Sequence, residues 1–437
     1  MPASEKSFEP DARALTAGLI EKWLVSGAFP DRLLNRVSSD RAVVTEMLYG
    51  VVRHRRKLEW IAEHCANRSL DPGVTPYVLL GLYQIMEMRD VAEHAALNET
   101  VEAVKSGFRD ASVNRRKGVA NFVNALLRRV LREREAIKNE VENLPLEIRE
   151  SHPDILVQRW TKHWGRDRTE RICAWNNSRP AVTLRIDSGR TTACELISEM
   201  KRRGMEGKPH SFAPEECVTL PRGVAPADVP GYSRGLFTVQ DPSTLSAVRL
   251  LKIEADSEVL DCCAAPGGKA VHIGWILRSA KQLCVADLSA ERTKLLRENL
   301  RRCGLETAAA AALDASRPEE IRKAFGNRTF DRVLLDVPCT STGAIRRRPD
   351  VKWRFSTRRL LRLVSTQRAI LQSASGFVRP GGRLVYSICS LEPEESEEII
   401  ASWLDANPSF RLLSSKHLAG PETETDGVYA AAVEKVK

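Results

Sequence analysis

Apolar residues recur at helical spacing through the first third of the chain. Helices are predicted at residues 11–26, 40–54, 77–88 and 119–130, and neither strand-like alternation nor a glycine-rich loop interrupts them. In the last segment the apolar residues fall on one face, and most of the neighbouring arginines lie off it. This region is therefore predicted to be an all-helical domain without visible catalytic residues. The apolar face consists of Val119, Phe122, Val123, Leu126, Leu127 and Val130.

The pattern changes after residue 235, where short apolar strands alternate with amphipathic helices. Such alternation predicts a parallel sheet with helices on both faces. Ligands of such sheets bind at the carboxyl ends of the strands. The strands are expected at residues 258–261, 282–287, 330–336 and 382–387, and the first two helices between them at 269–278 and 290–303.

The middle of the chain has a mixed pattern. A charged stretch at residues 132–150 is predicted to be a linker, and a strand-like segment at 181–186 and a helical one at 194–203 predict a small α+β module. A chain of 437 residues is too long for one ordinary core. We therefore expect a multidomain protein with an all-α domain (1–140), the linker and α+β module (141–234) and an α/β Rossmann-like domain (235–437).

Composition and charge narrow the class of protein. The chain is 43% hydrophobic and 28% charged, which is typical of a globular protein. Its net charge of +10 suits RNA or DNA as a partner, although an ordinary solvated basic surface explains the charge equally well. No apolar run is long enough to cross a membrane, and residues 1–7 do not begin a signal peptide, so we expect a cytosolic protein without membrane contact. Ten cysteines without a Cys-x-x-Cys pair predict free thiols rather than disulfides or a metal site.

A glycine turn follows the first strand of the α/β region. Gly267 and Gly268 allow a tight turn and close approach of a ligand, but the motif is not Gly-x-Gly-x-x-Gly, which disfavours a dinucleotide. Asp287 ends the next strand and Asp314 ends the third, so one acid could bind ribose hydroxyls and the other an adenine amino group. Alternatively, both acids cap helices, and the glycines only form a strand–helix turn.

Two cysteines, fifty residues apart, follow two further strands. Cys339 comes after Asp336 and Pro338, and Cys389 precedes Ser390. Thiols at two strand ends, beside a site for a nucleotide-like ligand, favour nucleophilic catalysis. The alternative for each cysteine alone is a buried structural thiol.

Together these motifs resemble the RNA cytosine-C5 methyltransferases of the Sun family. The resemblance implies S-adenosylmethionine as cofactor and Cys389 as the nucleophile that adds to C6 of cytosine. It further implies that Cys339 assists release of the methylated product and that Asp336 hydrogen-bonds or protonates N3. Val337, Ser341 and Ile388 depart from the family pattern, which bears on rate and substrate fit but removes no reacting group. By resemblance the cofactor site comprises Cys263, Ala264, Ala265, Pro266, Gly267, Gly268, Lys269, Asp287, Asp314 and Asp336.

The helical region has its own resemblance. Residues 94–101 and 122–129 are similar to the NusB-type RNA-binding domain, and the basic clusters at 53–57 and 115–117 could pair with phosphates or be solvated helix ends. A NusB-like domain joined to this catalytic domain implies methylation of one cytosine of 16S rRNA, either naked or in an early assembly intermediate, by a monomer without a metal. The alternatives are the same reaction on tRNA or another rRNA site, and a non-catalytic RNA-binding protein.

The loop after Cys339 is predicted to contact RNA. It resembles the family's RNA-facing loop and carries three consecutive arginines, followed by a tryptophan expected to be exposed. Such residues suit phosphate contact and base stacking, although a solvated charged loop has the same composition. The predicted RNA-binding residues are Arg346, Arg347, Arg348 and Trp353.

Overall fold

The computed structural model describes residues 11–88 and 91–436, so the residues expected to carry no signal peptide lie outside the described part. The chain forms two compact units. The first comprises Met1–Asn177 and Arg348–Arg354, and the second Ser178–Arg347 and Phe355–Lys437. Within the described ranges, no helix is both long and apolar enough to cross a membrane.

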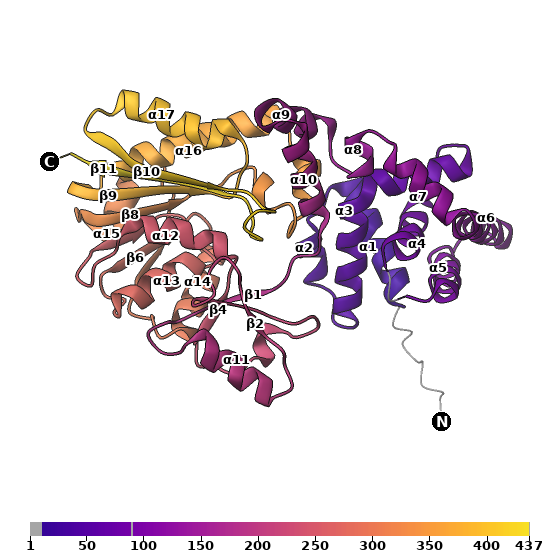
Figure 1. The fold of residues 1–437 in the computed structure, drawn as a ribbon, viewed down its shortest axis with the longest axis horizontal. Coiled ribbons are helices and arrows are strands. Elements are labelled where there is room, and N and C mark those ends of the chain that lie inside the picture. The colour runs from indigo at the N-terminus through magenta and orange to yellow at the C-terminus, as the bar shows by residue number, and fades with distance from the viewer. Residues whose placement is uncertain (1–10, 89–90, 437) are drawn as a thin grey trace. The chain divides into compact units, whose positions relative to one another are not determined.

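The first unit is helical, as predicted (Figure 1). Its core requires close approach of helices at two glycines: a Cβ at Gly50 would lie 1.9 Å from the ring of Tyr83, and one at Gly81 would lie 2.7 Å from Leu127. The helices are α1 (Ala12–Ser26), α2 (Pro30–Leu34), α3 (Arg41–Ala66), α4 (Thr75–Glu87), α5 (Glu93–Gly107), α6 (Val113–Arg132), α7 (Arg134–Glu142), α8 (Leu146–Arg149), α9 (Asp154–Trp164) and α10 (Arg166–Asn177).

The short segment Arg348–Arg354 belongs to this helical unit although it follows Cys339 in the sequence. Its Lys352 is fully buried and donates a hydrogen bond to the carbonyl oxygen of Arg53 at 2.7 Å. The indole N–H of Trp353 donates to Val52 at 2.7 Å, and the ring packs against the helical core. The prediction of an exposed tryptophan is therefore wrong: the hydrophobic ring gains more from packing than from water.

The second unit contains a seven-stranded sheet with the order β10-β11-β9-β8-β5-β6-β7. Strands β5 to β9 are parallel, as predicted, whereas β10 and β11 add an antiparallel edge that the sequence pattern did not reveal. The register pairs Asp261 with Leu334 and Asp336 with Ser387, so the strand ends that carry the motifs meet at one edge. The strands are β5 (Val259–Asp261), β6 (Leu283–Asp287), β7 (Ala309–Ala312), β8 (Phe330–Asp336), β9 (Val378–Ile388), β10 (Phe410–Leu418) and β11 (Val428–Lys435).

Helices cover both faces of this sheet (Figure 1). Successive side chains of a strand point to opposite faces. Accordingly, Val333 and Leu384 join the core under one set of helices, whereas Leu334 and Val385 join the core under the other. The first set is α15 (Pro318–Phe325), α16 (Thr357–Ser375) and α17 (Glu397–Ala406), and the second is α12 (Leu245–Leu251), α13 (Gly268–Leu277) and α14 (Ala290–Arg302).

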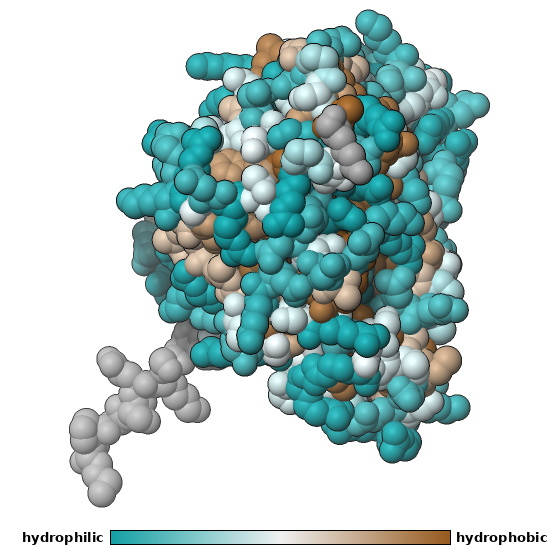
Figure 2. All heavy atoms as spheres, turned by 90° about the vertical axis from the view of Figure 1, so that its left-hand side faces the viewer, coloured by the Kyte–Doolittle hydropathy of each residue, from teal (hydrophilic) through white to brown (hydrophobic). Residues whose placement is uncertain are grey.

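The second unit also contains a small sheet of order β2-β3-β1-β4 with helix α11 (Ala193–Arg202). Thr192 and Glu195 form a reciprocal capping box that starts α11. Residues 141–234, predicted as one linker and module, are thus divided between the units after Asn177. The face in Figure 2 is mostly hydrophilic, with hydrophobic residues scattered over it. The strands are β1 (Thr183–Ile186), β2 (Lys208–Pro209), β3 (Cys217–Thr219) and β4 (Phe237–Val239).

Candidate active site

The two motif cysteines lie side by side at the carboxyl ends of neighbouring parallel strands. Cys339 follows β8 and Cys389 follows β9, and the two sulfur atoms are 3.5 Å apart. Cys339 is buried, whereas Cys389 is half-buried. The structure therefore brings together the two thiols that the sequence placed at separate strand ends.

The two thiols have opposite electrostatic preferences. The hydrogen bond from Cys339 lowers the pKa of Cys389 below its usual value, and Ser341 and Lys269 act in the same direction. The same hydrogen bond, together with burial, raises the pKa of Cys339 well above its usual value. Because the thiolate is the nucleophilic form of cysteine, this arrangement favours Cys389 as the attacking sulfur and keeps the proton on Cys339.

Asp336 and Lys269 form an ion pair beside the thiols. The Lys269 ammonium lies 2.7 Å from a carboxylate oxygen of Asp336, and the lysine side chain is nearly buried. Burial would lower the pKa of Lys269, but the attraction of Asp336 outweighs it and holds the pKa above its usual value. A positive charge is thereby fixed beside the end of β8, near the sulfur that carries negative charge.

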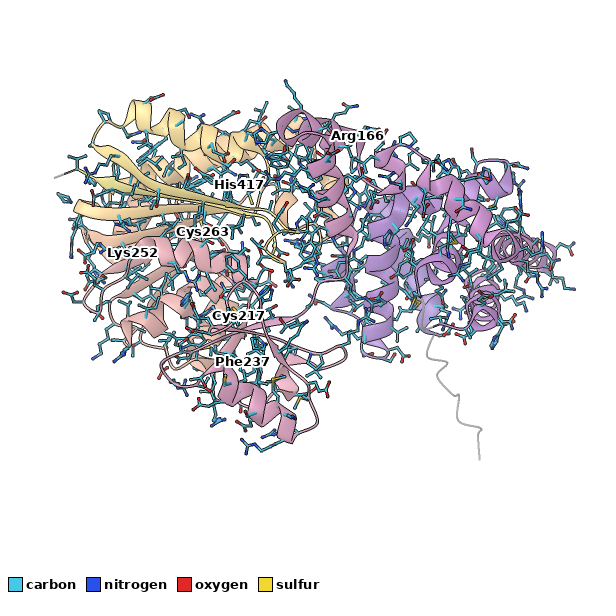
Figure 3. The ribbon with its side chains drawn as sticks, in the orientation of Figure 1. Arg166, Cys217, Phe237, Lys252, Cys263 and His417 are labelled. Carbon is cyan, nitrogen blue, oxygen red and sulfur yellow. The ribbon has the colours of Figure 1, made fainter. Side chains whose placement is uncertain are left out.

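A cavity of about 330 Å³ adjoins this ion pair. The turn from Cys263 to Lys269 and the side chain of Asp336 line it, and Figure 3 labels Cys263, the first residue of this turn. Gly267 has φ +114°, a conformation that side chains rarely adopt. The lining residues that the sequence did not reveal include Gln240, Asn299 and Arg302, which come from other elements.

Asp261 is a second group at this cavity that the sequence analysis missed. It is fully buried, and burial, reinforced by the charge of Asp336, raises its pKa to about 8. One of its carboxyl oxygens has no hydrogen-bond partner among the described residues. At neutral pH the group is a neutral acid that can donate a hydrogen bond to a ligand. The missed signal was an acid that ends a strand directly before the glycine turn.

The two acids predicted to bind an adenosyl group have local roles in the structure. Asp287 accepts a hydrogen bond from the backbone of Ala265 at 3.2 Å and so supports the turn. Asp314 accepts from the backbone and hydroxyl of Ser316, and these bonds lower its pKa. Neither acid lines the cavity of 330 Å³.

The predicted RNA-binding arginines differ in their surroundings. Arg346 is buried and donates to the carbonyl oxygen of Arg179 at 2.9 Å. Arg347 binds two buried carboxylates, those of Asp241 at 2.6 Å and Asp426 at 2.9 Å. The guanidinium of Arg346 is held inside the protein, and that of the half-buried Arg347 is engaged by two carboxylates. Arg348 is exposed. Contact of these arginines with RNA stays a prediction.

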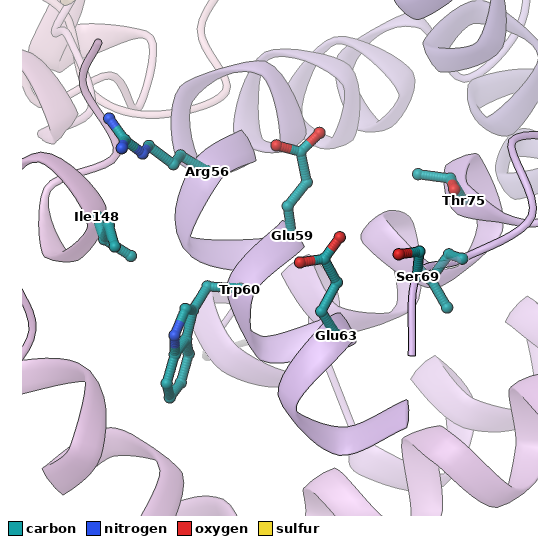
Figure 4. Close-up of a pocket in the computed structure, with 8 residues that line it drawn as sticks. Arg56, Glu59, Trp60, Glu63, Ser69, Thr75 and Ile148 are labelled. Atoms are coloured by element: carbon teal, nitrogen blue, oxygen red, sulfur yellow. The ribbon is translucent and has the colours of Figure 1, made fainter. Parts of the chain in front are cut away.

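The helical unit has a cavity of its own, of about 440 Å³ (Figure 4). Glu59, Trp60 and Glu63 line it together with Arg56, whose guanidinium pairs with Asp154 at 2.9 Å. Two carboxylates make this cavity a poor site for phosphate. It contains none of the residues predicted to be catalytic.

Three family models match successive parts of the chain. Residues 10–132 match the NusB family. Residues 152–226 match the ferredoxin-like domain of RsmF/B-like methyltransferases. Residues 248–432 match the 16S rRNA methyltransferase RsmB/F model.

Named relatives extend over nearly the whole chain. It is 34% identical to ribosomal RNA small subunit methyltransferase B of Klebsiella pneumoniae, over 97% of this chain and 98% of that protein. It is 33% identical to the probable ribosomal RNA small subunit methyltransferase B of Bacillus subtilis, over 85% and 81%.

Among solved structures, PH0851 covers 98% of this chain with a TM-score of 0.77 and 22% identity, and the alignment includes all of that protein. NSun6 from Pyrococcus horikoshii, solved with SFG, covers 66% of this chain and 99% of its own with a TM-score of 0.59 and 19% identity. These likenesses show the fold.

Proposed function

Because the chain belongs to the family of ribosomal RNA small subunit methyltransferases B, and is therefore an RNA methyltransferase that uses S-adenosylmethionine, we propose that it methylates C5 of one cytosine of 16S rRNA. The proposed target is cytosine 967. The reaction proceeds through a covalent bond between Cys389 and C6, and Cys339 assists its release. We place the reaction in the cytoplasm, with a monomer acting on naked 16S rRNA or an early assembly intermediate.

One observation carries this proposal: the two sulfur atoms lie 3.5 Å apart, with the pKa of Cys389 lowered and that of Cys339 raised. A catalyst that forms a bond to C6 needs a thiolate, and a second, protonated thiol within reach of the same base can assist the breaking of that bond. This pair supplies both in one place. An enzyme that methylates an amino group would need neither.

The residues at the cavity fit an adenosyl ligand with a charged methionine end. The glycine turn allows close approach of the ligand, and the Asp261 carboxyl oxygen that has no partner among the described residues offers it a hydrogen bond. Residues from Cys263 to Lys269 and Asp336 would hold it. Asp287 and Asp314 remain candidates for the ribose and the adenine, because they follow β6 and β7 at the same edge of the sheet. When bound, S-adenosylmethionine supplies an electrophilic methyl group.

The protein's own groups then act on the base. The Cys389 thiolate adds to C6, and the new sulfur–carbon bond makes C5 nucleophilic, so that C5 takes the methyl group. Asp336 donates a hydrogen bond to N3, where negative charge builds, with a proton that the adjacent Lys269 ammonium supplies to its carboxylate. Loss of the C5 proton and departure of Cys389 restore the aromatic ring: the Cys339 thiol gives its proton to the departing sulfur, and the Cys339 thiolate that results accepts the C5 proton.

Tritium release from 16S rRNA that carries C5-tritiated cytidine tests the reaction. With S-adenosylmethionine present, the wild type should release tritium and Cys389→Ala should not. Cys194→Ala is the matched control, because this thiol is exposed and lies outside the site, and it should behave like the wild type. If the wild type releases tritium from tRNA but not from 16S rRNA, the proposed substrate is wrong. Release from neither RNA would favour a non-catalytic RNA-binding protein.

A further inference from the structure

A buried carboxylate six residues after Cys389 binds the loop that carries Cys339. Glu395 ends a short 3-10 turn, Pro393–Glu395, and is completely buried. Its two carboxylate oxygens accept hydrogen bonds from the backbone N–H of Thr340 at 2.9 and 3.2 Å. The carboxylate therefore holds the peptide group directly after Cys339.

The peptide group before Cys339 is held by the same assembly. Gln367, on α16, donates from one amide nitrogen to Glu395 at 2.9 Å and to the carbonyl oxygen of Pro338 at 2.9 Å. Gln367 is itself completely buried. Cys339 is thus fixed on both sides by one glutamate–glutamine pair, while its own sulfur stays free to face Cys389.

The same carboxylate is linked to the second cysteine loop. The hydroxyl of Thr340 donates to Glu395 and lies 2.9 Å from the hydroxyl of Ser390, the neighbour of Cys389. The backbone of Glu395 is anchored by the hydroxyl of Tyr386, on β9, at 2.8 Å. Glu395 therefore connects the two segments whose sulfur atoms lie 3.5 Å apart.

We propose that Glu395 is a positioning residue for product release: it keeps the Cys339 thiol at the distance from Cys389 at which it assists departure of the methylated base. This inference rests on the proposed function and adds a residue to it. Glu395 acts through Thr340 and Gln367 and does not touch the substrate.

The chemistry of the site requires a carboxylate of this length. Four donors converge on Glu395: the N–H and hydroxyl of Thr340, the hydroxyl of Ser390 and the amide of Gln367, whose orientation is fixed by its second bond to Pro338. A glutamine at position 395 has one acceptor oxygen and turns an N–H₂ group toward donors, so a buried N–H would lose its acceptor. An aspartate keeps both oxygens but is one methylene shorter.

The test compares Glu395→Gln, Glu395→Asp and Cys339→Ala with the wild type. The control is Glu397→Gln, since Glu397 lies two residues further on and pairs instead with His417. Each variant is incubated with 16S rRNA and methyl-labelled S-adenosylmethionine. The readouts are denaturant-resistant protein–RNA adduct, labelled methyl groups per enzyme, and turnover.

We expect Glu395→Gln to transfer about one methyl group per enzyme, accumulate adduct as Cys339→Ala does, and lose about a hundredfold in turnover. Glu395→Asp should recover part of the turnover, and Glu397→Gln should match the wild type. A folded Glu395→Gln with wild-type turnover, or one that transfers no methyl group and forms no adduct, would overturn the inference.

Two further comparisons keep the test decisive. Thr340→Val serves as the test variant if Glu395→Gln does not fold, because it removes only the hydroxyl between Glu395 and Ser390. Thr340→Val should accumulate adduct. Turnover by Thr340→Val without adduct would count against a role for the Thr340 hydroxyl in product release. If wild type transfers no methyl group and Cys339→Ala forms no adduct, the proposed function itself has failed, which is distinct from failure of Glu395 alone.

Discussion

Arg347 and Arg348 are adjacent in the sequence, but their structures predict opposite effects on stability and RNA binding. Arg347 donates to Asp241 at 2.6 Å, to Asp426 at 2.9 Å and to the carbonyl oxygen of Ala181 at 2.9 Å. The side chains of the two acids are only 7% and 8% exposed. Arg347→Ala therefore leaves two buried carboxylates facing each other without a cation.

The expected loss follows from that geometry. Removing one partner of a buried ion pair costs about 3–5 kcal/mol, because the remaining charge is neither solvated nor paired. We expect Arg347→Ala to reduce the free energy of unfolding of the second unit by this amount. Arg348 is 48% exposed and its ion pair with Asp31 is long, at 3.9 Å, so Arg348→Ala should cost less than about 1 kcal/mol.

The loss should also depend on pH. Burial, together with the charge of Asp241, raises the pKa of Asp426 to about 7. A carboxyl with a raised pKa stabilises the fold while it is protonated, and this stability is lost as pH rises through the folded pKa. At pH 6 Asp426 is largely protonated, so Arg347→Ala should be less destabilising at pH 6 than at pH 8.

Urea unfolding at both pH values and 16S rRNA binding measure these effects together. Arg348→Ala should weaken RNA binding and leave the free energy of unfolding nearly unchanged. Arg347→Ala should lower the free energy of unfolding and affect RNA binding less than Arg348→Ala does. If Arg347→Ala unfolds like the wild type yet binds RNA more weakly than Arg348→Ala, then Arg347 contacts RNA and its pairs with Asp241 and Asp426 do not stabilise the fold.

Three further predictions concern the active site. Gly343→Ala places a Cβ 2.3 Å from a backbone oxygen of the loop before β11, and because Gly343 donates to the carbonyl oxygen of Cys389, turnover should fall about a hundredfold. Gly118→Ala is the control, because a Cβ added there would meet no atom within 4 Å. Equal turnover of the two variants would show that the Cβ at position 343 does not disturb the site. Cys339→Ala removes the hydrogen bond that lowers the pKa of Cys389, so alkylation of Cys389 by iodoacetamide should require a higher pH. The same dependence of the alkylation rate on pH in the variant and the wild type would contradict this role of the hydrogen bond. Asp261, with a pKa of about 8, keeps its proton in the folded protein at pH values where the unfolded chain has lost it. The free energy of unfolding should therefore fall by about 1.4 kcal/mol for each unit that the pH rises between roughly pH 4 and 8. Asp261→Asn should remove this slope, as measured by denaturation at several pH values, and an unchanged slope would show that Asp261 is ionised throughout.

The sequence predicted the features that depend on local pattern. The β5 and β9 strands, the glycine turn at Gly267 and the cysteines at the strand ends follow from alternation and turn chemistry, which neighbouring residues determine. Strand β10 was missed because most of its residues are exposed and polar, so it lacks the apolar pattern of the central strands.

Features that depend on tertiary contacts could not be predicted in this way. Arg346, Arg347 and Arg348 form one run of identical residues, and only the fold shows that the first is buried, the second half-buried and the third exposed. Glu395 lies in an acidic run that is typical of a solvated surface, yet it is completely buried because Thr340 and Gln367 supply donors from distant parts of the chain.

The most direct test of the two-cysteine assignment is mass-spectrometric mapping of the RNA adduct formed by Cys339→Ala with 16S rRNA and S-adenosylmethionine. The cytidine should be attached to the peptide that contains Cys389, and Cys389→Ala should form no adduct. A cytidine attached to Cys339 in the Cys389→Ala variant, with none formed by Cys339→Ala, would reverse the roles of the two thiols and contradict the assignment drawn from their pKa values.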